Sequence, residues 1–100
     1  MDAVDAYLEQ HATSHELSVD TLAEAMHTSA STLYRRMKAT TSLSPNEYIR
    51  LYRLKRAARM LRQEGLPIRE VSERLCFSSV AYFTNCFSRQ FGITPGEYVK

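Results

Sequence analysis

Apolar positions recur along this chain at the three- and four-residue spacing of amphipathic helices, in segments separated by short polar breaks. The longest segment, residues 44–63, predicts a long central helix. One apolar stripe of this helix is formed by Leu51, Leu54, Ala58 and Leu61, and other sides carry Tyr48, Ile49, Tyr52 and Met60. Because apolar residues lie on more than one side, we expect this helix to pack between two bodies.

The ends of the central helix are marked by start and stop signals. Ser44 is a good N-cap, Pro45 suits the first helical position, and Glu47 completes a capping box with Ser44. Gly65 follows the last periodic residue and favours termination.

Shorter segments on both sides of the central helix have the same periodicity. They predict helices at residues 3–11, 19–26, 30–38, 67–75 and 80–91, and a last helix that begins at Pro95. Two short helices joined by a tight turn make a helix-turn-helix, and this pair occurs on each side. We therefore predict an all-α fold of about seven helices. Its parts are a first helix-turn-helix subdomain at 1–43, a central linker helix at 44–63 and a second helix-turn-helix subdomain at 64–100.

The two sides are internal repeats. Residues 42–50 and 92–100 align at an offset of 50, which pairs Ser44 with Thr94, Pro45 with Pro95, Glu47 with Glu97 and Tyr48 with Tyr98. A chance likeness between amphipathic helices is disfavoured, because a capping box, a proline and a tyrosine recur in register. The central helix is then expected to set the spacing of two similar units.

Charge is distributed unevenly along the chain. Residues 1–34 hold six acids and no Lys or Arg, whereas residues 35–62 hold nine bases and one acid. A basic block of this kind indicates binding to a polyanion such as nucleic acid. The alternative reading is a solvated helix face.

Other classes of function find little support in the residues. Cys76 and Cys86 form no CxxC pair and fit a reducing compartment, and the three histidines have no zinc-ligand spacing with them. The three glycines form no phosphate loop. No segment is typical of a membrane span or a secretory leader. We expect a cytoplasmic protein that is not an enzyme, needs no cofactor or metal and makes no membrane contact.

The second helix of each helix-turn-helix can enter the major groove of DNA with the face opposite its buried residues. The predicted base contacts on these faces are Ser31, Tyr34, Arg35, Val80, Ala81, Tyr82, Thr84 and Asn85. The predicted phosphate contacts are the basic residues near them and the two N-cap serines, namely Ser29, Arg36, Lys38, Arg50, Arg53, Ser79 and Arg89. The first unit and the central helix should supply most of the salt-dependent affinity, because Arg89 is almost alone in the second unit.

The stretch IREVSERLCFSSVAYFTNCFSRQFGITPGEY resembles the signature of the AraC/XylS family of bacterial transcription activators. The resemblance extends from about Leu17 through Tyr98. It implies that two recognition helices enter successive major-groove segments of double-stranded DNA. It also implies a sensor or dimerisation domain elsewhere in a longer parent chain, and RNA polymerase is a further candidate partner. Cys76 and Ser42 stand where the family has glycine, which predicts strained turns.

We therefore expect one DNA-binding unit that recognises a specific sequence and regulates transcription. The alternative is a basic helical protein-interaction or adaptor module whose central helix docks an acidic partner.

Overall fold

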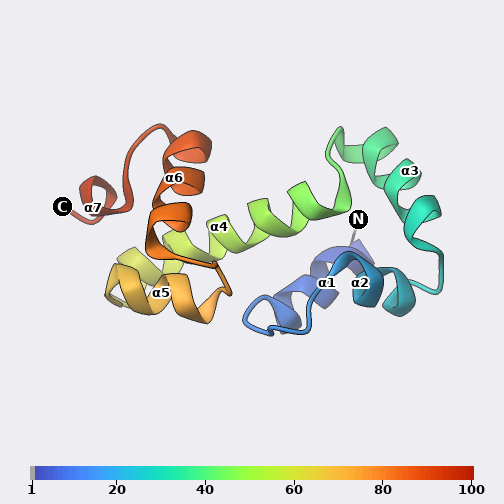
Figure 1. The fold of residues 1–100 in the computed structure, drawn as a ribbon, viewed down its shortest axis with the longest axis horizontal. Helices are drawn as coiled ribbons and strands as arrows, with labels where there is room; N and C mark the ends of the chain where they lie inside the picture. Colours follow the sequence, from blue (N-terminus) through green and yellow to red (C-terminus); the bar gives the residue numbers. More distant parts are fainter. Residues whose placement is uncertain (1) are drawn as a thin grey trace. The chain divides into compact units, whose positions relative to one another are not determined.

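Residues 2–100, which the computed structural model describes, form seven α-helices and no β-strand (Figure 1). In chain order the helices are α1 (Asp2–His11), α2 (Val19–Ala25), α3 (Ala30–Thr41), α4 (Pro45–Gln63), α5 (Ile68–Arg74), α6 (Val80–Phe91) and α7 (Pro95–Tyr98). The predicted all-α fold is confirmed. Helix α2 contacts α3, and α5 contacts α6, as two helix-turn-helix pairs.

Contacts within the chain divide it into two compact units, the first ending at Tyr52 and the second covering Arg53–Lys100. The division falls inside α4, so each unit receives one part of this helix. The predicted division at residues 43 and 63 stays a prediction.

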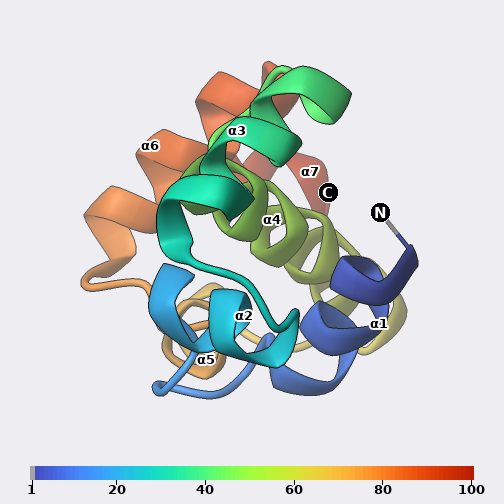
Figure 2. The same cartoon turned by 90° about the vertical axis from the view of Figure 1, so that its right-hand side faces the viewer.

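The first unit packs α1, α2, α3 and the start of α4 around one apolar core. Helices α1 and α2 lie side by side in it (Figure 2). The buried members of this core are Val4, Leu8, Leu17, Leu22, Ala23, Leu33, Met37 and Ile49. Burial of these side chains supplies most of the driving force that holds the helices together.

The second unit is built around aromatic rings. Phe83 and Phe87 are fully buried on α6, with their ring centroids 5.8 Å apart in an edge-on arrangement. Phe87 also contacts the rings of Phe91, at 4.7 Å, and Tyr98, at 5.5 Å. The aromatic contacts of Phe87 therefore join α6 to α7.

The predicted apolar stripe of α4 is only half right. Leu54 and Leu61 are buried, but Leu51 and Ala58 are half-exposed. The other buried side chains of α4 are Pro45, Ile49, Ala57 and Met60. Ile49 belongs to the core of the first unit, whereas the later residues lie in the second unit, so the buried face changes along the helix.

The capping boxes appear as predicted. In α4 the Ser44 N–H donates to Glu47 Oε1 at 2.9 Å, and the Glu47 N–H donates to Ser44 Oγ at 3.2 Å. In α7 the Thr94 N–H donates to Glu97 Oε1 at 3.2 Å, and the Glu97 N–H donates to Thr94 Oγ1 at 3.1 Å. Local hydrogen bonding thus explains why the repeated motif starts a helix in both places.

Three helices end on left-handed residues that are not glycine, and the first of these residues is His27, after α2, with φ 57°. Ser42 caps α3 with φ 65°, while its repeat counterpart Gly92 caps α6 with φ 77°. Cys76 follows α5 with φ 64°, and the N–H of Phe77 then donates to the Ser72 carbonyl at 3.1 Å. Ser42 and Cys76 thus adopt the positive φ that glycine tolerates best, and strain at these two residues stays a prediction.

Replacing Ser42 by glycine should raise the free energy of unfolding by about 1 kcal/mol, because glycine adopts positive φ without the steric cost. Urea denaturation followed by circular dichroism measures this change. The control is Ser88→Gly inside α6, which should instead lower stability by about 0.5–1 kcal/mol. Equal destabilisation by both substitutions would contradict strain at Ser42.

Two tyrosines of α4 bind two acids of α1 within the first unit. The Tyr48 hydroxyl donates to Asp5 Oδ1 at 2.5 Å, and the Tyr52 hydroxyl donates to Glu9 Oε2. Both pairs are separated by 43 residues, so the two contacts recur one helical turn apart. Burial, and then the hydrogen bond to Asp5, raises the pKa of Tyr48 to about 12.

This raised pKa predicts a loss of stability in alkali. The Tyr48 hydroxyl has a pKa of 10.0 in the unfolded state, so the folded state holds its proton more tightly. The contribution is therefore complete below pH 10 and is lost as the pH rises towards about 12. The midpoints of urea denaturation of the parent protein and of the Tyr48→Phe variant, measured at several pH values, test this prediction. The parent should lose more stability across the window, and parallel pH profiles would contradict the prediction.

Candidate nucleic-acid interface

Helix α3 presents the predicted contact residues of the first unit to solvent. Leu33 and Met37 face the core, whereas Ser31, Tyr34 and Arg35 are exposed, with Tyr34 at 48%. Their placement follows from helical periodicity, since residues 31, 34 and 35 recur at the i, i+3, i+4 spacing of one helix face and the buried pair occupies another. All three are positioned on the side of α3 away from the core.

The start of α3 holds a small group of hydroxyls. Ser29 is the N-cap, and the Thr32 N–H donates to its Oγ at 3.2 Å. Arg35 Nη2 in turn donates to Thr32 Oγ1 at 3.3 Å, which directs the guanidinium along the exposed surface towards the start of the helix. A guanidinium on this surface can donate to a guanine edge or to a phosphate.

Helix α6 presents the predicted contact residues of the second unit in the same way. Val80 and Tyr82 are 40% and 44% exposed, and Ala81 and Asn85 are also exposed. Thr84 is half-buried, so it reaches solvent with only part of its side chain. The second unit therefore offers a less polar exposed face than α3.

Two residues with no predicted contact role support α6. The ring of Phe77 contacts the rings of Tyr82, at 6.1 Å, and Phe83, at 4.9 Å. Ser72 is 1% exposed and its Oγ donates to the Ser79 carbonyl at 3.4 Å, next to the N-cap of α6. The sequence feature that could have predicted this hydrogen bond is the position of Ser72, a polar residue on the inward face of α5.

The basic candidates differ in how freely they can meet a phosphate. Arg36, Arg50 and Arg89 are exposed. Lys38 Nζ lies 3.9 Å from Glu47 Oε1 in a surface pair, which is worth at most about 1 kcal/mol. Arg53 belongs to the second unit and is half-buried, and burial lowers the pKa of its guanidinium.

The charge of the two recognition-helix candidates is unequal. Helix α3 carries three basic residues and no acid, whereas Arg89 is the one basic residue of α6. The side chains on α3 can therefore neutralise more phosphate charge than those on α6.

Each unit has a surface hollow. In the first unit a hollow of about 410 Å³ is lined by Val19, Ala30, Ser31, Tyr34, Ser44, Pro45 and Asn46. It lies beside the predicted contact face of α3, and sequence analysis assigned no role to Asn46.

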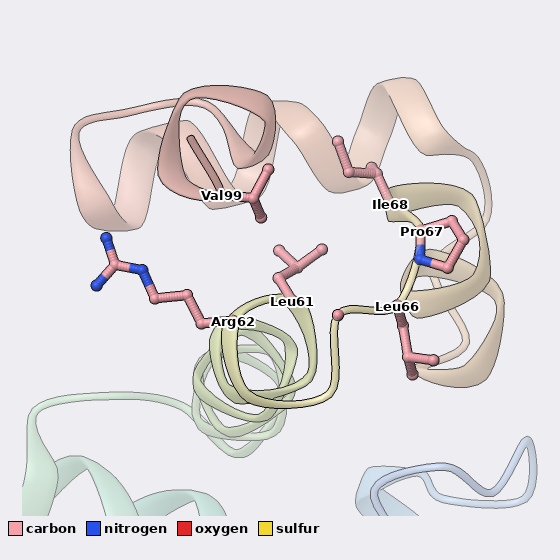
Figure 3. A pocket seen from close by; sticks show the side chains of 7 residues that line it. Leu61, Arg62, Leu66, Pro67, Ile68 and Val99 are labelled. Atoms are coloured by element: carbon pink, nitrogen blue, oxygen red, sulfur yellow. The ribbon is translucent and has the colours of Figure 1, made fainter.

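The hollow of the second unit has a volume of about 510 Å³ (Figure 3). Leu61 and Val99 point towards one another across it, while the Arg62 guanidinium points away. Arg62 Nε donates to the Tyr98 carbonyl at 3.3 Å, and its Cζ lies 4.3 Å from the centre of the Tyr98 ring. Arg62 thus ties the last turn of α4 to α7.

Within residues 2–100, no group of three or more His, Cys, Asp or Glu side chains could hold a metal ion. Over the same residues, no helix combines the length and the apolar character needed to cross a membrane.

Comparisons with known proteins agree with this geometry. The helix-turn-helix domain family matches residues 22–100. The chain is 33% identical over 92 residues to the transcriptional activator RhaS of Escherichia coli, and 34% identical over 91 residues to histidine kinase P4 of Formosa agariphila. These matches cover 92% and 91% of this chain but 33% and 7% of the relatives, so the chain spans a third or less of their length.

Solved structures share the fold. An AraC-type transcriptional regulator from Chromobacterium violaceum superposes with a TM-score of 0.90 at 28% identity, over 98% of this chain and 87% of that one. The DNA-binding domain of AdpA, solved in complex with a target DNA, superposes with a TM-score of 0.85 at 29% identity, over 96% of this chain and 86% of that one. These relatives do not favour the adaptor alternative.

Proposed function

The chain belongs to the helix-turn-helix domains of the AraC/XylS family, and on this premise we propose that it binds double-stranded DNA at specific sequences and regulates transcription. The observation that carries the proposal is the likeness of the whole fold to the AdpA domain, which was solved on its target DNA. The exposed, basic face of α3 supports the same function, because DNA binding depends first on neutralising phosphates.

In the first unit, α3 is the proposed recognition helix. Arg35 donates to the O6 and N7 edge of guanine, and Tyr34 and Ser31 hydrogen-bond or contact a thymine methyl. Exposure of all three side chains on one face supports these roles.

In the second unit, α6 is the proposed recognition helix. Asn85 pairs with the N6 and N7 edge of adenine, while Val80 and Ala81 contact thymine methyl groups. Tyr82 and Thr84 add contacts from the same face. The small apolar side chains suit close approach to bases more than attraction to phosphates.

The proposed phosphate contacts come from the N-cap serines Ser29 and Ser79 and from the basic residues Arg36, Lys38, Arg50, Arg53 and Arg89. Most of the salt-dependent affinity comes from the first unit, because α3 carries three bases against one on α6. Among these residues Arg53 makes the weakest contact, since it is half-buried.

Titration of labelled duplexes at two salt concentrations tests the proposal. One duplex has a mixed sequence and the other is selected from a random pool by the protein itself. We expect tighter binding of the selected duplex, and weaker binding of both duplexes as salt rises. Absence of binding at low salt would refute DNA binding, and equal affinity for both duplexes would refute sequence specificity.

The cellular setting is proposed from the same premise. The relatives named above are longer than this chain, and a sensor or dimerisation domain in a longer parent chain would link DNA binding to a signal. RNA polymerase is the proposed partner at the promoter, and the cytoplasm is the proposed location. Copurification of RNA polymerase with the DNA-bound protein tests the partner.

A further inference from the structure

The hollow of the first unit lies between the predicted contact face of α3 and the first residues of α4. From α3 it is lined by Ala30, Ser31 and Tyr34, and from the start of α4 by Pro45 and Asn46. Ser31, Tyr34 and Asn46 are exposed, so their hydroxyl and amide groups are available to a ligand. The other lining residues are Val19, Ala30 and Pro45, which are apolar, and the N-cap serine Ser44.

The internal repeat shows that the polar groups around this hollow are particular to the first unit. At the offset of 50, Ser31 corresponds to Ala81, Tyr34 to Thr84 and Asn46 to Gly96. The second unit thus lacks the amide, one hydroxyl and the phenol at the matching positions. A proline and a capping box start the corresponding helix in both units, with Pro45 in α4 and Pro95 in α7. Helix formation at this point therefore does not require Asn46.

We propose that the hollow seats one sugar–phosphate of the DNA strand next to α3, and that the Asn46 side-chain amide donates to its phosphate oxygen. The proposal rests on the DNA binding proposed above. Apolar side chains such as Val19 and Ala30 suit the deoxyribose, and an uncharged donor such as the Asn46 amide is a common partner of phosphate oxygens.

Charged residues of both signs lie next to the lining residues along the chain. Arg35 and Arg36 are exposed on α3, and Arg50 is exposed on α4. The acids are Asp20, which follows Val19, and Glu47, which follows Asn46; hydrogen bonds from the Ser44 backbone and hydroxyl lower the pKa of the Glu47 carboxyl. Lys38, with Nζ 3.9 Å from Glu47 Oε1, offsets this negative charge.

The test substitutes Asn46 by alanine and measures affinity for the selected and the mixed duplex. Loss of a hydrogen bond from an uncharged amide to an ionised phosphate should weaken binding of both duplexes by about 10-fold or more. The slope of affinity against salt should stay unchanged, because the amide releases no counterion. The matched control is Gln10→Ala, which removes an exposed amide on α1 and should leave affinity unchanged.

The repeat also provides a reciprocal variant. A Cβ added at Gly96 meets no atom closer than Thr94 Oγ1, at 4.0 Å, so Gly96→Asn fits the fold. The double variant with Asn46→Ala and Gly96→Asn should bind the duplexes as weakly as Asn46→Ala alone. Full recovery of affinity would show that the position of the amide is unimportant and would overturn the proposal.

Single methylphosphonate replacements along the selected duplex locate the contact. At one phosphate next to the bases that α3 reads, neutralisation should cost the Asn46→Ala variant less affinity than it costs the parent, as shared contacts are not additive. Equal losses at every phosphate would overturn the proposal. A changed base preference in Asn46→Ala would assign the amide to a base instead.

The two proposals fail in distinguishable ways. If the parent protein binds no duplex, DNA binding and the Asn46 contact are both refuted. If the parent binds and Asn46→Ala binds equally well, only the Asn46 contact is refuted. Urea unfolding of each variant confirms that affinity is compared between folded proteins.

Discussion

Replacing Phe87 by alanine should lower the free energy of unfolding by about 3–5 kcal/mol. Its side chain is fully buried and contacts the rings of Phe83, Phe91 and Tyr98. The loss combines removal of apolar area from the core with a cavity between α6 and α7. Because a small domain has a total stability of about 5–15 kcal/mol, this change should bring the second unit close to unfolding at room temperature.

Phe91→Ala is the matched control for this substitution. Phe91 is on the same helix one turn later, but it is 36% exposed and its ring contact is with Phe87. We expect a loss of about 1 kcal/mol, since much of its surface already meets water. Urea denaturation by circular dichroism measures both variants. Similar losses for Phe87→Ala and Phe91→Ala would show that Phe87 does not hold the core of the second unit.

Replacing Arg35 by alanine should weaken binding to the selected duplex by about 1–3 kcal/mol and relax base preference at one position of the site. Arg35 is exposed on α3, and its guanidinium is already directed along the contact face by the hydrogen bond to Thr32. A guanidinium with two donors in a fixed plane is suited to guanine, and alanine leaves that edge without a partner.

The contrast for Arg35→Ala is the pair Arg36→Ala and Lys38→Ala. These residues are proposed to bind phosphate, so their removal should lower affinity for all sequences and reduce the salt slope by about one for each lost contact. Selection from random duplexes, followed by titration at several salt concentrations, separates the two effects. If Arg89→Ala reduces the slope of affinity against salt more than Arg36→Ala and Lys38→Ala together, most of the salt-dependent affinity comes from the second unit instead.

Much of the fold could be predicted because helix boundaries depend on local interactions. Ser29, Ser44, Ser79 and Thr94 cap the predicted helices through hydrogen bonds that reach three residues along the chain. The positive φ of Ser42 and Cys76 fits the glycine that the family has at these places, because backbone handedness at a helix end is a local property. The exposure of Tyr34 and Tyr82 followed from the buried residues of their own helices.

The candidate site was less accessible to sequence reasoning where it depends on neighbouring elements. Thr84 and Arg53 were predicted as contacts from periodicity and charge, yet both are half-buried. Their exposure is set by the packing of the second unit and not by their own helix. The roles of the contact residues stay predictions until binding is measured.

The sequence by itself determined where helices begin and end, that two helix-turn-helix pairs repeat, and which face of α3 carries positive charge. These properties follow from interactions across three or four residues and from periodicity. Only the tertiary structure decided that Ala57 and Met60 are buried, that Tyr48 binds Asp5, and that Asn46 shares a hollow with Ser31. Such contacts join residues far apart in the chain, so they depend on how several helices pack together.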